Sequence, residues 1–122
     1  MEIILLCWMP GQKTPIHDHS QSDCWVRVLS GSIEESIFDP AGFIDESLIK
    51  LPSRKKQLKK GESSFINNNL GLHTLENTTS EKAITVHLYT PPIMSCLSYD
   101  SSEKEKKERS LFYDSIYGKI FQ

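Results

Sequence analysis

Short apolar runs separated by turn signals constrain the fold of this chain more than any other feature. The runs are rich in Ile, Val, Leu, Phe and Tyr, and they cover residues 2–8, 24–29, 32–38, 64–66, 73–76, 83–89 and 116–121. Turn dipeptides such as Pro10-Gly11, Ser30-Gly31 and Lys60-Gly61 separate them. No stretch of eleven residues carries the apolar repeat of an amphipathic helix. We therefore expect an all-β sandwich or barrel.

Length and composition indicate one small domain, spanning residues 1–122. A chain of 122 residues can bury one modest core. Its 38% hydrophobic and 25% charged residues exclude a disordered or membrane composition. The net charge of −2 gives no general attraction to nucleic acid. The three cysteines, Cys7, Cys24 and Cys96, are an odd number at irregular spacing, which favours reduced thiols in the cytoplasm over a disulfide framework.

The first residues, MEIILLCWMPG, are apolar but have neither the basic start nor the small-residue cleavage site of a signal peptide. They are also too few to cross a bilayer, so we interpret residues 2–8 as a strand. The chain begins one residue before this strand. We therefore expect an N-terminally incomplete barrel, in which the apolar residues of this strand are poorly covered, and we expect a monomer.

Two runs of charge lie in the second half of the chain. Residues 54–60 carry five positive charges in seven positions. Lysines on an exposed edge strand or loop prevent edge-to-edge pairing, and we favour this interpretation over a nucleic-acid patch, which would carry interleaved aromatic residues. Residues 103–109 mix both signs, and we expect a solvated loop there.

The pair His17 and His19 is the first candidate for chemistry. Residues two apart in an extended segment point to the same side, so both imidazoles can reach one metal ion. Alone the pair is weak evidence, because two histidines in a polar surface loop need bind nothing. Gly11 precedes His17 by five intervening residues, and four residues separate His19 from Cys24. Six residues separate Cys24 from Gly31, and this spacing resembles the first cupin motif, with Cys24 at its acidic position.

A second block, from Gly61 to His73 and Asn77, resembles the second cupin motif, whose histidine supplies a further metal ligand. Its loop departs from that motif, because asparagines at positions 67–69 replace the usual proline and glycine. Many non-haem iron sites use two histidines and one carboxylate. Three neutral histidines would leave the full charge on Fe(II), which suits a substrate that brings a thiolate. A closed zinc site with Cys24 as fourth ligand is the lower-ranked alternative, because Cys24 lies on the neighbouring strand.

Thr85, His87 and Tyr89 alternate along one strand and therefore share a face, whereas Val86 and Leu88 occupy the other face. A polar strand face commonly meets water. Because three candidate metal ligands belong to the same small barrel, we expect this polar face to point into the interior instead.

Three blocks in register resemble cysteine dioxygenase over about residues 2–100. They are HDH at 17–19 with the cysteine at 24, GLH at 71–73 with EN at 76–77, and HLYTPP at 87–92. The resemblance implies a cupin-type barrel, or double-stranded β-helix, in which His17, His19 and His73 bind Fe(II). It further implies a thioether cross-link between Cys24 and Tyr89, whose hydroxyl contacts substrate and oxygen.

His87, with Thr85, would hold that hydroxyl in place. The implied reaction adds both atoms of O2, the co-substrate, to the thiol of L-cysteine and gives cysteine sulfinate. Members of that family carry further residues before this segment, including an arginine that clamps the substrate carboxylate. Arg27, Arg54 and Arg109 do not match it, so we expect weak activity on L-cysteine. A dioxygenase for another small thiol and a non-catalytic metal-binding cupin are the alternatives.

Overall fold

The structure, a computed structural model, describes residues 1–39, 52–93, 95–99, 107–110, 115–117 and 119–120, and for 95–99, 107–110 and 115–116 it describes the backbone alone. Within these residues the chain forms strands and no helix. The strands are β1 Glu2–Trp8, β2 Ile16–His17, β3 Asp23–Ser30, β4 Ser32–Phe38, β5 Arg54–Lys59, β6 Ser63–Ile66, β7 Leu72–Glu76, β8 Ala83–Thr90, β9 Ser95–Tyr99, β10 Lys107–Ser110, β11 Ser115–Ile116 and β12 Lys119–Ile120.

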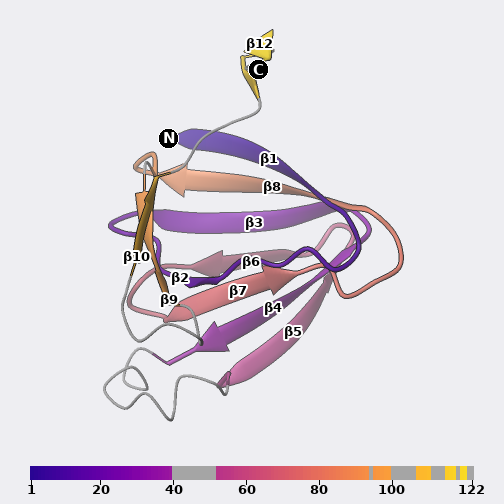
Figure 1. Cartoon of the computed structure of the whole chain (residues 1–122), viewed down its shortest axis with the longest axis horizontal. Coiled ribbons are helices and arrows are strands. Elements are labelled where there is room, and N and C mark those ends of the chain that lie inside the picture. The colour runs from indigo at the N-terminus through magenta and orange to yellow at the C-terminus, as the bar shows by residue number, and fades with distance from the viewer. Residues whose placement is uncertain (40–51, 94, 100–106, 111–114, 118, 121–122) are drawn as a thin grey trace.

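Two antiparallel sheets make up the body of the fold. One has the order β1-β8-β3-β6 and the other β10-β9-β2-β7-β4-β5, while β11 and β12 pair with each other. Figure 1 shows β1, β8 and β3 stacked in the upper half of the view, with β7, β4 and β5 below them. Residues of the two edge strands β5 and β6 line a common pocket. Over the described residues, no helix has the length and apolar character needed to cross a bilayer.

Most strands lie where the apolar runs predict them. β1 and β4 have the predicted bounds, β6, β7 and β8 differ by one residue at one end, and β3 differs by one residue at each end. The run at 116–121 instead overlaps a short antiparallel pair of β11 and β12, and its residues 118 and 121 lie outside the described residues. The loop predicted at 103–109 is wrong for its last residues, because β10 pairs there with β9. Backbone hydrogen bonds, which charged side chains do not prevent, stabilise that pairing.

The hydrophobic core lies between the two sheets, because side chains along each strand point alternately inward and outward. In β3, Cys24, Val26 and Val28 are buried, whereas the residues between them are largely exposed. These side chains pack in one cluster with Ile33 of β4 and Leu75 of β7, which belong to the opposite sheet. Burial from both sheets fixes the pairing register, because a shift of one residue would turn each apolar side chain outward.

The outer face of the four-stranded sheet is apolar as well. Ile3 and Leu5 of β1 are 65% and 63% exposed, and the exposed rings of Trp25 and Phe65 lie 4.8 Å apart on β3 and β6. The prediction that the first strand has poorly covered apolar residues is therefore confirmed. An apolar surface of this kind is unusual for a soluble monomer.

The basic run forms β5, the edge strand of the six-stranded sheet, as expected for lysines that protect an edge. Its side chains alternate: Leu58 is fully buried, and Lys55 lies on the outside, where its ammonium is 3.7 Å from the Glu34 carboxylate.

Candidate metal centre

Strand pairing brings the three predicted metal ligands together. β2 and β7 are antiparallel neighbours with His17 opposite His73, and His19 follows two residues after β2. One ring nitrogen from each of the three histidines lies within 4.8 Å of the others. His19 and His73 are each only 1% exposed. Three imidazoles thus converge inside the fold from segments more than fifty residues apart in sequence.

Hydrogen bonds assign the tautomers of two of these rings. His17 Nδ1 lies 2.9 Å from the carbonyl oxygen of Pro15, and His73 Nδ1 lies 2.9 Å from the Glu35 carboxylate. Both oxygens accept, so both Nδ1 atoms donate. The two Nε2 atoms then carry lone pairs, and they face each other at 3.0 Å. Two lone pairs this close repel each other unless a cation lies between them.

The His19 ring provides a second indication of a bound cation. Both of its nitrogens are buried, and neither has a hydrogen-bond partner. Leaving a buried polar atom unsatisfied costs about 1–3 kcal/mol. Two nitrogens bound at right angles at about 2.1 Å, an ordinary metal–imidazole distance, would be about 3.0 Å apart, which fits the His17–His73 pair. The residues therefore fit a metal ion.

Burial keeps the three rings in the form that binds metals. Loss of solvation is the largest cause that lowers the pKa of His17, His19 and His73, and mutual repulsion among the rings lowers the pKa values of His19 and His73 further. For His17 the hydrogen bond to Pro15 opposes the effect. A divalent metal requires neutral imidazole, so protonation does not compete with it near neutral pH.

Glu35 is a component of the site that the sequence interpretation missed. It is 2% exposed, accepts the His73 Nδ1–H bond with one oxygen, and accepts a 2.6 Å bond from the Ser64 hydroxyl with the other. Burial raises the pKa of the Glu35 carboxyl, while the Ser64 bond and the charges of Arg54 and Lys56 oppose this. A carboxylate behind a metal-binding histidine fixes ring orientation and raises ligand basicity. The sequence feature that could have identified Glu35 is a glutamate at an inward-facing position of strand β4.

The asparagine loop holds the His-x-His segment. The amide oxygen of Asn68 accepts a 2.9 Å bond from the His19 backbone N–H, and its amide nitrogen donates to the Ser20 carbonyl. Asn67 donates to the Asp23 carboxylate at 3.1 Å. The departure of this loop from the second cupin motif therefore has a structural use, because its amides fix the backbone at His19.

The polar face of β8 points inward, as predicted, because Thr85 and His87 are 0% and 2% exposed. Trp8 Nε1–H donates to the Thr85 hydroxyl at 2.9 Å, and that hydroxyl lies 2.7 Å from His87 Nε2. The hydroxyl has one proton to donate, and His87 Nε2 is the acceptor that the described residues supply for it. The neutral ring then carries its own proton on Nδ1, which lies 3.3 Å from the Tyr89 hydroxyl. Burial lowers the pKa of His87 to about 4, which keeps it neutral.

Cys24 and Tyr89 are directly opposite each other on β3 and β8. The Cys24 thiol is fully buried, and loss of solvation raises its pKa to about 12, although a hydrogen bond with Tyr89 opposes the rise. Among the described side chains, the group that can share one metal ion contains the three histidines and not Cys24. The arrangement gives no support to a zinc site with Cys24 as fourth ligand.

Sequence comparison decides the family. The profile of cysteine dioxygenase type I matches residues 1–102. The chain belongs to the cysteine dioxygenase type I family. It is 32% identical over 117 residues to the cysteine dioxygenase type 1 of Rattus norvegicus, 34% to that of Danio rerio and 31% to that of Homo sapiens. These alignments cover 95% of this chain and 58% of each relative, so the chain spans well under two thirds of the relatives' length.

Solved structures confirm the fold of this cysteine dioxygenase family member. The oxalate decarboxylase of Lactobacillus farciminis superposes with a TM-score of 0.62 at 21% identity, covering 79% of this chain and 25% of that one. A Klebsiella pneumoniae protein with a double-stranded β-helix domain gives 0.55 at 20% identity, covering 71% and 64%. The predicted all-β, cupin-type architecture is therefore confirmed.

The described arginines lie away from the three histidines. Arg27 is exposed on the outer face of β3, because it lies between inward-facing Val26 and Val28. Arg54, on β5, lines a separate pocket whose walls contain no histidine. Arg109 lies in β10, where the structure describes the backbone alone. Among the side chains that the structure describes, no arginine therefore stands beside the ligand cluster.

Proposed function

We propose that this chain carries the centre of an iron-dependent thiol dioxygenase, with Fe(II) held by His17, His19 and His73. The observation that carries the proposal is the His19 ring, whose two buried nitrogens lack partners, beside two Nε2 lone pairs 3.0 Å apart. Family membership supplies the reaction class. In that reaction both atoms of O2 join the thiol sulfur, so that R–SH and O2 give R–SO2H, the sulfinic level of thiol oxidation.

The ligand set suits an anionic substrate. All three ligands are neutral, so the charge of a divalent ion stays available to a thiolate. An iron(II) ion held there would supply the redox chemistry that combines a thiol with oxygen. Glu35 keeps His73 in the binding tautomer, and the Asn68 amide fixes the backbone that carries His19. The protein's contribution at this level is to position the ligands and to exclude water from them.

Tyr89 supplies a positioned hydroxyl beside the ligand cluster. Its ring stacks on the His19 ring with centroids 6.5 Å apart, and its hydroxyl accepts from His87 Nδ1. The chain Trp8–Thr85–His87 fixes the direction of that bond. The Tyr89 proton is thereby directed away from His87 and toward its hydrogen-bond partner Cys24, and a bound substrate or oxygen would take that place.

We further propose that Cys24 and Tyr89 form a thioether. Their opposed positions on β3 and β8 and their side-chain hydrogen bond support it. Joining sulfur to the ring removes one hydrogen from each side chain, and oxygen in the presence of the iron centre would be the oxidant. The link would fix the Tyr89 ring, and with it the hydroxyl, against rotation.

L-cysteine is the proposed substrate, on the strength of the family. A second candidate is a small thiol without a carboxylate, such as cysteamine. The positions of the described arginines favour this candidate, because neither Arg27 nor Arg54 stands at the histidine cluster. A buried charge-assisted contact typically contributes about 2–5 kcal/mol, which is roughly 30- to 4000-fold in binding. We therefore propose weak discrimination between the two thiols for the 122-residue chain.

We further propose a cytoplasmic location, since Cys7 and Cys24 carry free thiols.

The experiment loads the chain anaerobically with iron(II), adds cysteine or cysteamine, and follows oxygen uptake together with sulfinate formation by mass spectrometry. Protein loaded with zinc, which has no redox chemistry, is the matched control. Oxygen uptake with equimolar sulfinate in the iron sample supports the proposal. Bound iron without sulfinate from either thiol would favour a non-catalytic cupin. Strong preference for cysteine would refute the proposed weak discrimination.

A further inference from the structure

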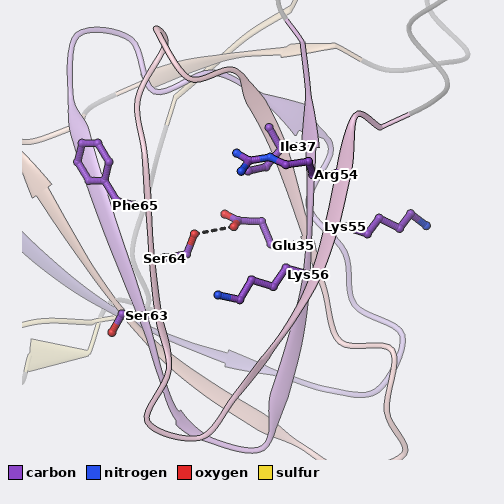
Figure 2. A pocket seen from close by; sticks show the side chains of 8 residues that line it. All are labelled: Glu35, Ile37, Arg54, Lys55, Lys56, Ser63, Ser64 and Phe65. Atoms are coloured by element: carbon purple, nitrogen blue, oxygen red, sulfur yellow. Dashed lines mark hydrogen bonds between the residues drawn. The ribbon is translucent and has the colours of Figure 1, made fainter.

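A pocket between the edge strands β5 and β6 lies outside the candidate metal centre. It encloses about 560 Å³, within the usual range for sites that bind small molecules. Its lining comes from β4, β5 and β6, with Arg54, Lys56 and Glu35 on one side and Ser63, Ser64 and Phe65 on the other (Figure 2). Neither the proposed dioxygenase chemistry nor family membership assigns this pocket a role.

Positive charge is in excess inside the pocket. Figure 2 shows Arg54 and Lys56 extending toward Ser64 on the two sides of Glu35, whereas Lys55 points away from it. The Glu35 carboxylate is already engaged, since one oxygen accepts from Ser64 and the other from His73. Two cations thus share the pocket with a single carboxylate whose hydrogen bonds go elsewhere. No ion pair within 4 Å joins Arg54 or Lys56 to another described residue.

Protection of an exposed edge does not require these two inward-facing side chains. All four cations of the edge strand are exposed, and Lys55 and Lys59, on its outer side, already supply that protection. The guanidinium of Arg54 and the ammonium of Lys56 extend instead into the pocket toward Ser64. The Ser64 proton is already donated to Glu35, so these two cations are the donors that remain. Such a set of donors, without a matching acceptor of its own, is complementary to an anion.

Ile37 adds an apolar side chain beside Arg54 (Figure 2). Phe65 also lines the pocket, but its ring points away from Glu35 and lies 4.8 Å from that of Trp25 on the outer face of the sheet. An inorganic ion would leave Ile37 uncovered. A small organic acid would place its anionic group between the two cations and its apolar body against Ile37, where burial of apolar area favours binding by about 25 cal/mol per Å².

We propose that the pocket between β5 and β6 binds a small organic anion, a carboxylate with an apolar body, through Arg54 and Lys56. The site goes beyond the proposed dioxygenase function and does not depend on it. Its position behind Glu35, which contacts His73, places the bound anion on the far side of that histidine from the ligand cluster.

Benzoate is the probe, titrated into the 122-residue chain at low salt and followed by calorimetry and by the amide NMR signals of Ser64 and Phe65. Benzyl alcohol keeps the ring without the charge, and inorganic phosphate keeps the charge without the ring. Arg54→Gln and Lys56→Gln each remove one inward charge. Lys55→Gln is the matched control, because it removes the same charge from the same strand on the outside.

We expect saturable benzoate binding, at least tenfold tighter than that of benzyl alcohol, and at least tenfold weaker in Arg54→Gln and in Lys56→Gln. Lys55→Gln should change it less than twofold. Equal weakening by all three variants would overturn the proposal, since it would mean general charge attraction only. Phosphate binding tighter than benzoate would overturn the organic class, and absence of saturation would overturn the site.

Discussion

Replacing Glu35 by glutamine is the sharpest perturbation of the metal centre. The glutamine amide keeps the shape of the carboxylate, so its oxygen can still accept the His73 Nδ1–H bond while its nitrogen turns to the Ser64 hydroxyl. What is lost is the charge. A hydrogen bond to a charged group contributes about 1.5–3 kcal/mol and a neutral one about 0.5–1.5, so the His73 bond weakens by roughly 1.3 kcal/mol, which is close to tenfold.

We therefore expect Glu35→Gln to bind iron(II) about tenfold more weakly than the unaltered chain. Glu35→Leu removes the acceptor altogether and should cost about 100-fold, the upper end for outer partners of metal-bound histidines. The measurement is anaerobic competition with a chromophoric chelator, and urea unfolding of the metal-free variants reports whether they still fold.

Glu34→Gln is the matched control, because it makes the same change one residue away, where the carboxylate faces outward and pairs with Lys55. It should alter iron affinity less than twofold. An affinity of Glu35→Gln equal to that of this control would refute the reasoning, since Glu35 would then neither fix nor polarise His73.

Three further predictions test other parts of the site and the surface. Burial lowers the pKa of His87 to about 4 from 6.5 in the unfolded chain. The unfolded state therefore binds the extra proton as pH falls below 6.5, and the metal-free chain should lose about 2 kcal/mol of unfolding free energy between pH 7 and pH 5 through His87. Urea titrations should show this part of the loss absent from His87→Gln, and an unchanged loss would contradict it. Peptide mapping after turnover with iron and cysteine should yield a Cys24–Tyr89 peptide lighter by two hydrogens, absent from Tyr89→Phe; its absence from the unaltered chain would remove the proposed cross-link. Exposed Ile3 and Leu5 should bind the dye anilinonaphthalene sulfonate, and serine at both positions should lower its fluorescence. A chain that is monomeric in sedimentation and binds no dye would show that this face is not an accessible apolar surface.

Strand positions were predictable where side chains alternate. β1 has the predicted bounds because it presents apolar residues at every second position to the core, and β4 because Ile33 and Ile37 do so on either side of Glu35. β2, β9 and β10 were not predicted, because β2 is two residues long and the charged residues of β10 give no apolar signal. Pairing with neighbouring strands defines these elements, and a local sequence pattern does not contain its partners.

The sequence by itself determined the candidate ligands. The spacing of His17, His19 and His73 and their match to a known family identified them as candidate metal ligands, because a short motif reflects the local backbone that such a site needs. It also placed Tyr89 and His87 on one inward face, since period-two alternation is a property of any strand.

Only the tertiary structure decided what surrounds these residues. Glu35 reaches His73 across 38 positions of sequence, and Asn68 reaches the backbone of His19 across 49. The inward turn of Arg54 and Lys56 likewise depends on where β5 joins the six-stranded sheet. Each of these contacts depends on which strands become neighbours in the two sheets. Burial of the whole core determines the strand pairing, so no local stretch of sequence encodes these contacts.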